Sequence, residues 1–305
     1  MSARESQLLV TGASGKLGRR VAELLLEEQR PQRLVLVTRS PEALDDLADR
    51  GAEVRFGDFA QPESLRAAFA GGGRMLLISA SDLEVRAEQH RTAILAAAEA
   101  GVRHIAYTSG LRPEPPNPAA IAPSHYATEQ ALAASGIAWT ALRNSLYSEY
   151  QVPEAARALS AGVLTHNRGD GQIAYVSRDD CAAVAAAVLT TPGHENRVLD
   201  VTGPDLFTAD DLAALYSEAG RRSVSAESLD DDEFVERLQG PASDDEHARY
   251  GARLVCSLGR SIREGYMAAC TDVVARLTAR PPRTLRSLLE ADSSVTAVEV
   301  AGRPR

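Results

Sequence analysis

The stretch LLVTGASGKLGRR, residues 8–20, decides the fold. An apolar run leads into glycines at Gly12, Gly15 and Gly18, and apolar residues from Leu17 onward recur at helical spacing. The first two glycines let the backbone approach a pyrophosphate, and the third lets a helix pack on the strand. The N-terminal N–H groups of that helix then face the anion. The pattern predicts a dinucleotide-binding turn; a glycine turn without a ligand is the alternative.

Composition limits the function classes. The chain has 305 residues, of which 44% are hydrophobic, enough for a large α/β domain with a small lobe. The net charge of −9 disfavours general nucleic-acid binding. A transmembrane helix needs about 18 apolar residues in a row, and the chain lacks such a run, so no membrane contact and a cytoplasmic location are expected. Cys181, Cys256 and Cys270 have no metal-site spacing and are predicted to be buried, with no metal bound.

Strand and helix patterns alternate up to residue 110. Strands are predicted at 33–40, 52–56, 74–79 and 104–109, and helices at 41–50 and 84–100, the latter with Ile94, Leu95 and Ala98 facing inward. Such a series predicts a doubly wound parallel sheet of the Rossmann type, in which the ligand crevice lies at the carboxyl ends of the strands. Gly12, Arg39, Asp58, Ser79 and Ser109 all fall at those ends.

The end of the second strand indicates the cofactor. NAD-preferring sites place Asp or Glu there for the ribose 2′-hydroxyl, whereas this chain has Thr38 and Arg39. Arg39 can contact a 2′-phosphate, and Lys16, the chain's single lysine, can add a second charge. NADPH is therefore the predicted cofactor; a solvated surface arginine is the alternative.

Later strand ends add candidate contacts. Asp58 can accept from the adenine amino group while Phe59 packs on the ring, or Asp58 can cap the next helix. The small residues Ser79 and Ser81 let the nicotinamide ribose pass close to the backbone.

The rest of the chain is predicted to complete the sheet and add a lobe. Residues 110–124 hold five prolines and form a loop that is a candidate lid. After this loop the sequence predicts strands at 137–143, 172–176 and 196–202. It also predicts helices at 125–135 and 179–189, a mixed helical stretch at 147–164, and a polar, flexible segment at 239–249. The expected domains are an NAD(P)-binding domain over 1–150, completed by 172–202; a smaller α/β substrate lobe over 151–292; and a flexible tail over 293–305.

Five segments together resemble a known family: TGASGKLG, LLISASD, HIAYTSGL, HYATEQAL and LRNSLYSEY. From about Leu8 to Leu289 the chain is similar to the NmrA-like, atypical short-chain dehydrogenase/reductases, especially their NADPH:quinone oxidoreductase type 2 group. The resemblance implies a Rossmann domain, NADPH, and hydride delivery to a quinone-like acceptor.

The resemblance also implies residue roles. Gly12, Gly15 and Leu17 would meet the pyrophosphate, Arg39 the 2′-phosphate, Asp58 and Phe59 the adenine, and Ser79 and Ser81 the ribose. Ser14 is a further candidate for cofactor binding. His125, Tyr126 and Asn144 would border the nicotinamide, with Ser109 as the substrate-orienting serine.

Two positions depart from the relatives. Tyr126 replaces an aliphatic residue, and Gln130 replaces the lysine that lowers a tyrosine's pKa in short-chain dehydrogenases. An amide can still hold the ribose, so Tyr126 would act as a neutral hydrogen-bond donor, and His125 is the nearest titratable acid. Packing roles for Tyr126 and His125 are the alternatives.

The leading hypothesis is an NADPH-dependent reductase of a small quinone or other conjugated carbonyl compound. A non-catalytic NADP(H) sensor that binds a protein partner, and a ketoreductase or isomerase of secondary metabolism, are the competing hypotheses. A homodimer is left open.

Overall fold

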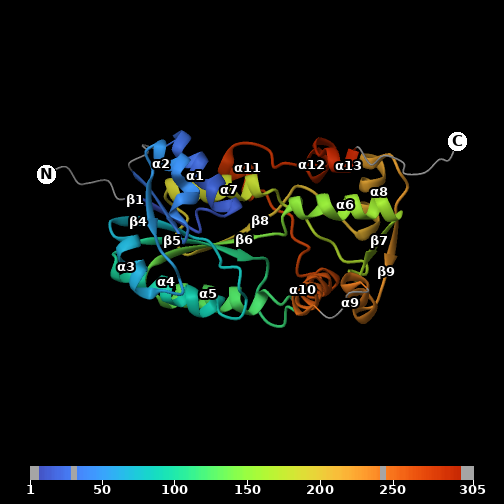
Figure 1. The fold of residues 1–305 in the computed structure, drawn as a ribbon, viewed down its shortest axis with the longest axis horizontal. Helices are drawn as coiled ribbons and strands as arrows, with labels where there is room; N and C mark the ends of the chain where they lie inside the picture. The colour runs from blue at the N-terminus through green and yellow to red at the C-terminus, as the bar shows by residue number, and fades with distance from the viewer. Residues whose placement is uncertain (1–6, 29–32, 241–244, 297–305) are drawn as a thin grey trace.

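Parallel strands in the order β3-β2-β1-β4-β5-β6-β8 form a seven-stranded sheet, seen in the left half of Figure 1. A computed structural model describes residues 7–28, 33–240 and 245–296. The strands are β1 Gln7–Thr11, β2 Leu34–Thr38, β3 Glu53–Phe56, β4 Gly72–Leu77, β5 His104–Gly110, β6 Ala138–Asn144 and β8 Arg197–Val201. The predicted Rossmann-type sheet is confirmed.

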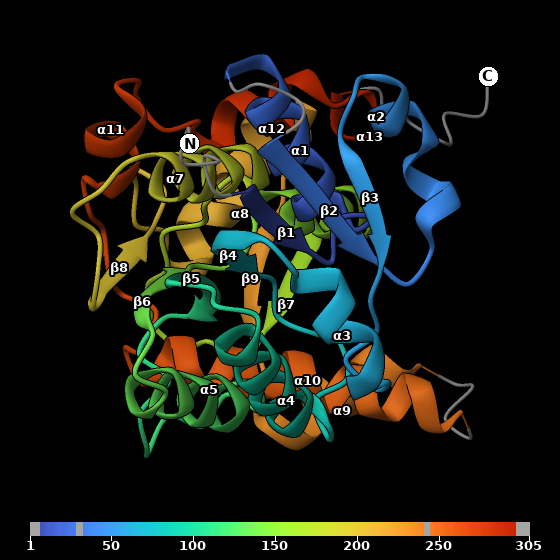
Figure 2. The same cartoon turned by 90° about the vertical axis from the view of Figure 1, so that its left-hand side faces the viewer.

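Helices cover both faces of this sheet, as Figure 2 shows. One layer holds α1 Lys16–Glu28, α7 Arg178–Thr190 and α11 Val273–Thr278, and the other holds α3 Pro62–Phe69, α4 Arg86–Glu99 and α5 Ala122–Ala134. A 3-10 turn at Pro41–Leu44 and a short α2, Asp45–Asp49, replace the single helix expected at 41–50. The near-continuous apolar strands follow from burial on both faces.

Strand β1 lies between β2 and β4, so the connections turn in opposite directions on its two sides. Ligands of open α/β sheets bind at the carboxyl ends of the strands at such a point. The glycine turn follows β1 there.

A smaller group of elements lies at the right of Figure 1. It comprises a 3-10 turn at Ser148–Tyr150, α6 Gln151–Ala161, β7 Val163–His166, α8 Ala209–Gly220, β9 Ser225–Ser228, α9 Asp231–Gln239, α10 Glu246–Arg263, α12 Leu285–Ala291 and α13 Ser293–Thr296. Strands β7 and β9 pair in parallel, and a core that includes Leu159, Tyr216 and Ile262 fills the lobe. This separate core supports the division near residue 150, which we retain as a proposal.

The strand predicted at 172–176 is wrong. Within it, Ile173 makes an isolated bridge to Phe207, and Val176 makes one to Tyr147. The strand of this region is β7, which begins at the end of the stretch expected to be helical at 147–164 and runs past it. Gly162 ends α6 with a φ of +76°, and the chain then pairs with β9.

Several local expectations also need correction. On α4 the buried face is His90, Ala93, Ile94 and Ala97, whereas Leu95 is 60% exposed and Ala98 is also exposed. In the segment predicted to be flexible at 239–249, residues 246–249 belong to α10. In the predicted tail at 293–305, Ser293–Thr296 form α13, with Val295 buried. Residues 241–244 and 297–305 lie outside the described residues. Cys270 is exposed, unlike Cys181 and Cys256.

Among the helices that the structure describes, none has the length and apolar character needed to span a membrane.

Candidate active site

The glycine turn has the geometry that its sequence predicts. Gly12 has a φ of +59°, and its carbonyl accepts from the Gly15 N–H at 3.0 Å. A Cβ atom at Gly18 would lie 2.4 Å from the Gly12 oxygen and 2.8 Å from the Ala13 Cα. The third glycine is therefore required for α1 to pack on the turn.

The outer surface of this turn suits an anion. Gly12, Ser14, Gly15 and Lys16 are exposed, and the first turn of α1 has no acidic side chain. The Leu17 side chain is buried in the core, so only its backbone can meet a pyrophosphate. These features fit a dinucleotide's phosphates at a helix N-terminus.

Two basic side chains stand near this surface without a partner in the described parts of the chain. Arg39, directly after β2, is exposed and forms no hydrogen bond or ion pair there; the same holds for Lys16. Ser14 Oγ lies 2.8 Å from Thr38 Oγ1, which joins the turn to the end of β2. Arg39 is thus free to meet a 2′-phosphate.

Asp58 and Phe59 follow β3 and are both half-buried. The Asp58 carboxylate accepts from the Ala60 N–H at 3.0 Å, and Gln61 occupies the N-cap of α3, so Asp58 does not cap that helix. The Phe59 ring meets His90 edge to face, with 6.3 Å between centroids. The predicted adenine contacts lie at the expected strand end.

A buried histidine holds the segment that follows β4. The Ala80 N–H donates to His90 Nε2 at 3.0 Å, so Nδ1 carries the proton and donates to Thr128 Oγ1 at 2.9 Å. Burial lowers the pKa of His90 to about 3, which keeps this neutral tautomer. The Ser79 N–H donates to Thr108 Oγ1 at 2.9 Å. The backbone from Ser79 to Ser81 is thereby fixed beside β5.

His125 lies in the same network. Its Nδ1 is 2.8 Å from the Tyr107 hydroxyl, and its Nε2 is 3.4 Å from Arg86 Nη1. Burial, with the Arg86 guanidinium nearby, lowers the pKa of His125 to about 3. The prediction that His125 is an acid with a pKa suited to neutral pH is therefore wrong, because its imidazole is neutral.

Ser109, at the end of β5, belongs to a second buried cluster. Its Oγ donates to Glu129 Oε1 at 2.6 Å, and Arg143 binds both carboxylate oxygens of Glu129, at 3.0 and 2.6 Å. A further Arg143 bond reaches Glu114. Because the Ser109 proton is committed to Glu129, Ser109 offers the site acceptor lone pairs rather than a donor.

The three remaining candidates differ in environment. Tyr126 is half-buried and its hydroxyl has no hydrogen-bond partner among the described residues. Gln130, one helical turn later, is exposed. The buried Oδ1 of Asn144, at the end of β6, likewise has no partner in the described chain. An orphaned amide oxygen at a strand end suits a bound carboxamide or another donor.

The proline-rich loop at 110–124, a candidate lid from its sequence, is hydrogen-bonded both to the sheet and to the lobe. Glu114 binds Arg143, whereas Ala120 N–H and Asn117 Oδ1 bond Ser257 and Ser261 of α10. These bonds make the loop a strap between the sheet and the lobe.

Residue-level reasoning missed Arg86, His90 and Glu129. For Glu129 the signal was present in H-x-x-T-E, since positions i, i+3 and i+4 place His125, Thr128 and Glu129 on one face of α5.

The buried side chains of His90 and His125 predict a stability that depends on pH. Their pKa values are about 3 when folded and about 6.5 when unfolded, so the unfolded state binds more protons between these limits. The contribution of these histidines to the free energy of unfolding is complete above pH 6.5. It falls by up to about 1.4 kcal/mol per pH unit for each histidine as the pH drops toward 3. Urea unfolding from pH 7 to 4 should show a shallower loss in H90Q/H125Q. H247Q, at an exposed position, is the control, and parallel curves for all three proteins would contradict the prediction.

The sheet, the glycine turn and the strand-end residues define a dinucleotide-binding protein of the Rossmann class. The chain belongs to the NAD(P)H-binding family, whose pattern matches residues 12–192. It is 39% identical to quinone oxidoreductase 2 of Escherichia coli (strain K12) over 232 residues, which is 76% of this chain and 81% of that protein. It is 28% identical to the NAD(P)H azoreductase of Xenophilus azovorans over 288 residues, 94% of this chain and 98% of that one.

A solved structure agrees. The NADPH-dependent quinone oxidoreductase QOR2 of Escherichia coli, complexed with NADPH, superposes with a TM-score of 0.87 at 34% identity, covering 93% of this chain and 98% of that chain. The predicted family and the predicted class of NAD(P)H-dependent oxidoreductase are confirmed.

Proposed function

We propose that this chain uses NADPH to reduce a quinone or another conjugated carbonyl compound. The observation that carries the proposal is the exposed glycine turn at the β1 switch point, beside Arg39, whose side chain has no partner among the described residues. The relatives named quinone oxidoreductase support the acceptor class.

The residues present fit the cofactor. Gly12, Ser14, Gly15, Lys16 and Leu17 would hold the pyrophosphate, Arg39 the 2′-phosphate, Asp58 and Phe59 the adenine, Ser79, Ser81 and Gln130 the ribose, and Asn144 the nicotinamide side. The bound cofactor supplies the hydride.

The chain's own part is to orient the acceptor and provide a proton. Tyr126 donates a hydrogen bond to the acceptor oxygen, because its hydroxyl is not engaged by the described chain. Ser109 accepts and helps to position the acceptor, held by Glu129. His125 is neutral and fixes the Tyr107 side of the site rather than acting as an imidazolium acid.

Consumption of NADPH, followed at 340 nm with a panel of quinones, tests the proposal. We expect turnover that depends on both substrates. Tight NADPH binding without oxidation by any acceptor would favour the sensor hypothesis, and an isomerised product would favour the third hypothesis.

Arg39 predicts the choice of cofactor. One charge-assisted contact contributes roughly 1.5–3 kcal/mol, so NADPH should bind about 10- to 100-fold more tightly than NADH. Arg39→Ala should remove most of this preference in calorimetric titrations. Arg50→Ala, which lies before β3 at the amino edge of the sheet, should not. Equal affinities in the unaltered protein would contradict the assignment.

A further inference from the structure

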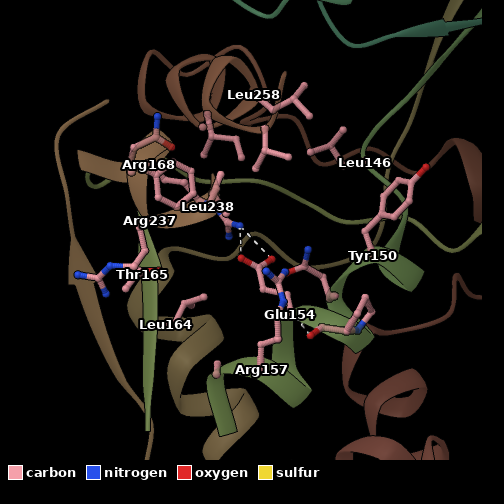
Figure 3. A pocket seen from close by; sticks show the side chains of 18 of the residues that line it. Leu146, Tyr150, Glu154, Arg157, Leu164, Thr165, Arg168, Arg237, Leu238 and Leu258 are labelled. Atoms are coloured by element: carbon pink, nitrogen blue, oxygen red, sulfur yellow. Dashed lines mark hydrogen bonds and ion pairs between the residues drawn. The ribbon is translucent and has the colours of Figure 1, made fainter. Parts of the chain in front are cut away.

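A cavity of about 750 Å³ lies in the lobe, next to the candidate active site. Its walls come from α6, β7, α9 and α10, and most of its lining is apolar, with Phe234 among the side chains. Figure 3 shows Leu164, Leu238 and Leu258 in this lining. This volume is in the range that holds a whole drug-sized molecule.

One end of the cavity reaches the strand ends of the main sheet. Ile121 and Leu146 line it, from the segments just before α5 and just after β6. A Cβ atom on Gly110 would lie 3.8 Å from Ile121 Cδ1 and 3.4 Å from His125 Cδ2, so Ile121 borders the site of Ser109 and His125. A molecule whose reducible group sits at that site can extend into the cavity.

The charged lining has an excess of arginine. Arg157, Arg168 and Arg237 line the cavity against one carboxylate, Glu154. Figure 3 shows Glu154 and Arg168 meeting inside, and their bonds of 2.8 and 3.0 Å neutralise both charges. Two positive charges remain, in a chain whose net charge is −9.

These two remaining arginines are available to a ligand. Arg157 forms no ion pair with the described residues and donates only to the Pro153 carbonyl at 3.3 Å. Arg237 is 3.7 Å from Glu227, with both side chains about half exposed, an arrangement that contributes little.

The inner wall adds polar groups that have no hydrogen-bond partner among the described residues. Arg168 Nη1 and the Tyr175 hydroxyl are buried and form no hydrogen bond with the described residues. Burial raises the pKa of Tyr175 to about 12, so its hydroxyl keeps its proton and remains a donor. Donors without acceptors favour an oxygen-rich ligand group.

We propose that the cavity selects acceptors that carry an acidic group, such as a carboxylate, sulfonate or phosphate, on an apolar body, with the acidic group directed to Arg157 and Arg237. The proposal rests on the proposed function, because it assigns the acceptor of the same site.

A matched pair of acceptors tests it: a 1,4-naphthoquinone with a carboxyalkyl chain, and the methyl ester of the same compound. The two share the reducible ring and differ in one charge. We expect the unaltered protein to prefer the acid in kcat/KM, and R157Q/R237Q to lower the ratio of acid to ester by about tenfold or more. R253Q, an exposed position of α10 outside the cavity lining, is the control and should keep the ratio.

An unchanged ratio in R157Q/R237Q would overturn the inference while turnover of both acceptors still supports the proposed function. If neither acceptor oxidises NADPH, the proposed function fails, and calorimetry with the acid alone then decides the inference. Binding lost in R157Q/R237Q but kept in R253Q would support it, and equal binding by all three proteins would overturn it.

Discussion

Gly12→Val is expected to abolish NADPH binding while the chain remains folded. The residue has a φ of +59°, where a side chain other than glycine is strained by roughly 1–3 kcal/mol. Its Cβ would already lie 3.4 Å from the Ile78 Cβ, and the branched side chain would occupy the exposed surface of the turn, where the pyrophosphate is expected. Gly15→Val should act in the same way, because its Cβ would meet the Gly12 carbonyl at 3.2 Å.

The control for backbone strain is Gly101→Val. Gly101 has a φ of +79°, nothing lies within 4 Å of a Cβ there, and the residue precedes β5 at the opposite edge of the sheet. Calorimetric titration should show an affinity loss of more than about 100-fold for Gly12→Val, and little change for Gly101→Val. Circular dichroism should report folded protein in both. Normal NADPH binding by Gly12→Val would make the turn purely structural.

Tyr126→Phe is expected to lower kcat/KM for a quinone by about 100-fold and to leave NADPH affinity intact. The hydroxyl has no hydrogen-bond partner among the described residues, and a positioned acid contributes about 10²- to 10⁴-fold. The neutral His125 cannot replace it as an imidazolium. Tyr266→Phe, a half-buried tyrosine beyond α10, serves as the control.

A second measurement at the same site restores the lysine that Gln130 replaces. Gln130 is exposed and lies one turn after Tyr126, so Gln130→Lys can be tolerated and places an ammonium on the same side of α5. A nearby ammonium favours phenolate, so the pH optimum for alcohol oxidation should move downward. If Tyr126→Phe leaves kcat/KM unchanged, this tyrosine only lines the pocket. If His125→Ala leaves it unchanged as well, the sensor hypothesis is favoured.

The Rossmann half of the fold could be predicted from local pattern. Continuous apolar strands and glycines at 12, 15 and 18 leave few alternatives, because sheet burial and the turn each require those residue types. Arg39, Asp58, Ser79 and Ser109 were placed correctly at strand ends, since a parallel βαβ series brings those ends to one edge.

The lobe could not be predicted in the same way. Strand β7 exists because β9, about 60 residues later, pairs with it, and no local pattern marks such a partner. Residues 172–176 have the sequence pattern of a strand, but they form only isolated bridges, to two different segments.

The chemical states of the site also depend on residues far apart in the chain. His125 has an ordinary side chain, yet burial beside Arg86, 39 positions earlier, makes it neutral. Ser109 loses its donor role to Glu129, 20 positions later. The pKa of a group and the direction of its hydrogen bonds are set by its three-dimensional surroundings. A glycine turn, by contrast, is set by the backbone conformation of a few adjacent residues. Local sequence therefore predicts the turn and not the proton donor.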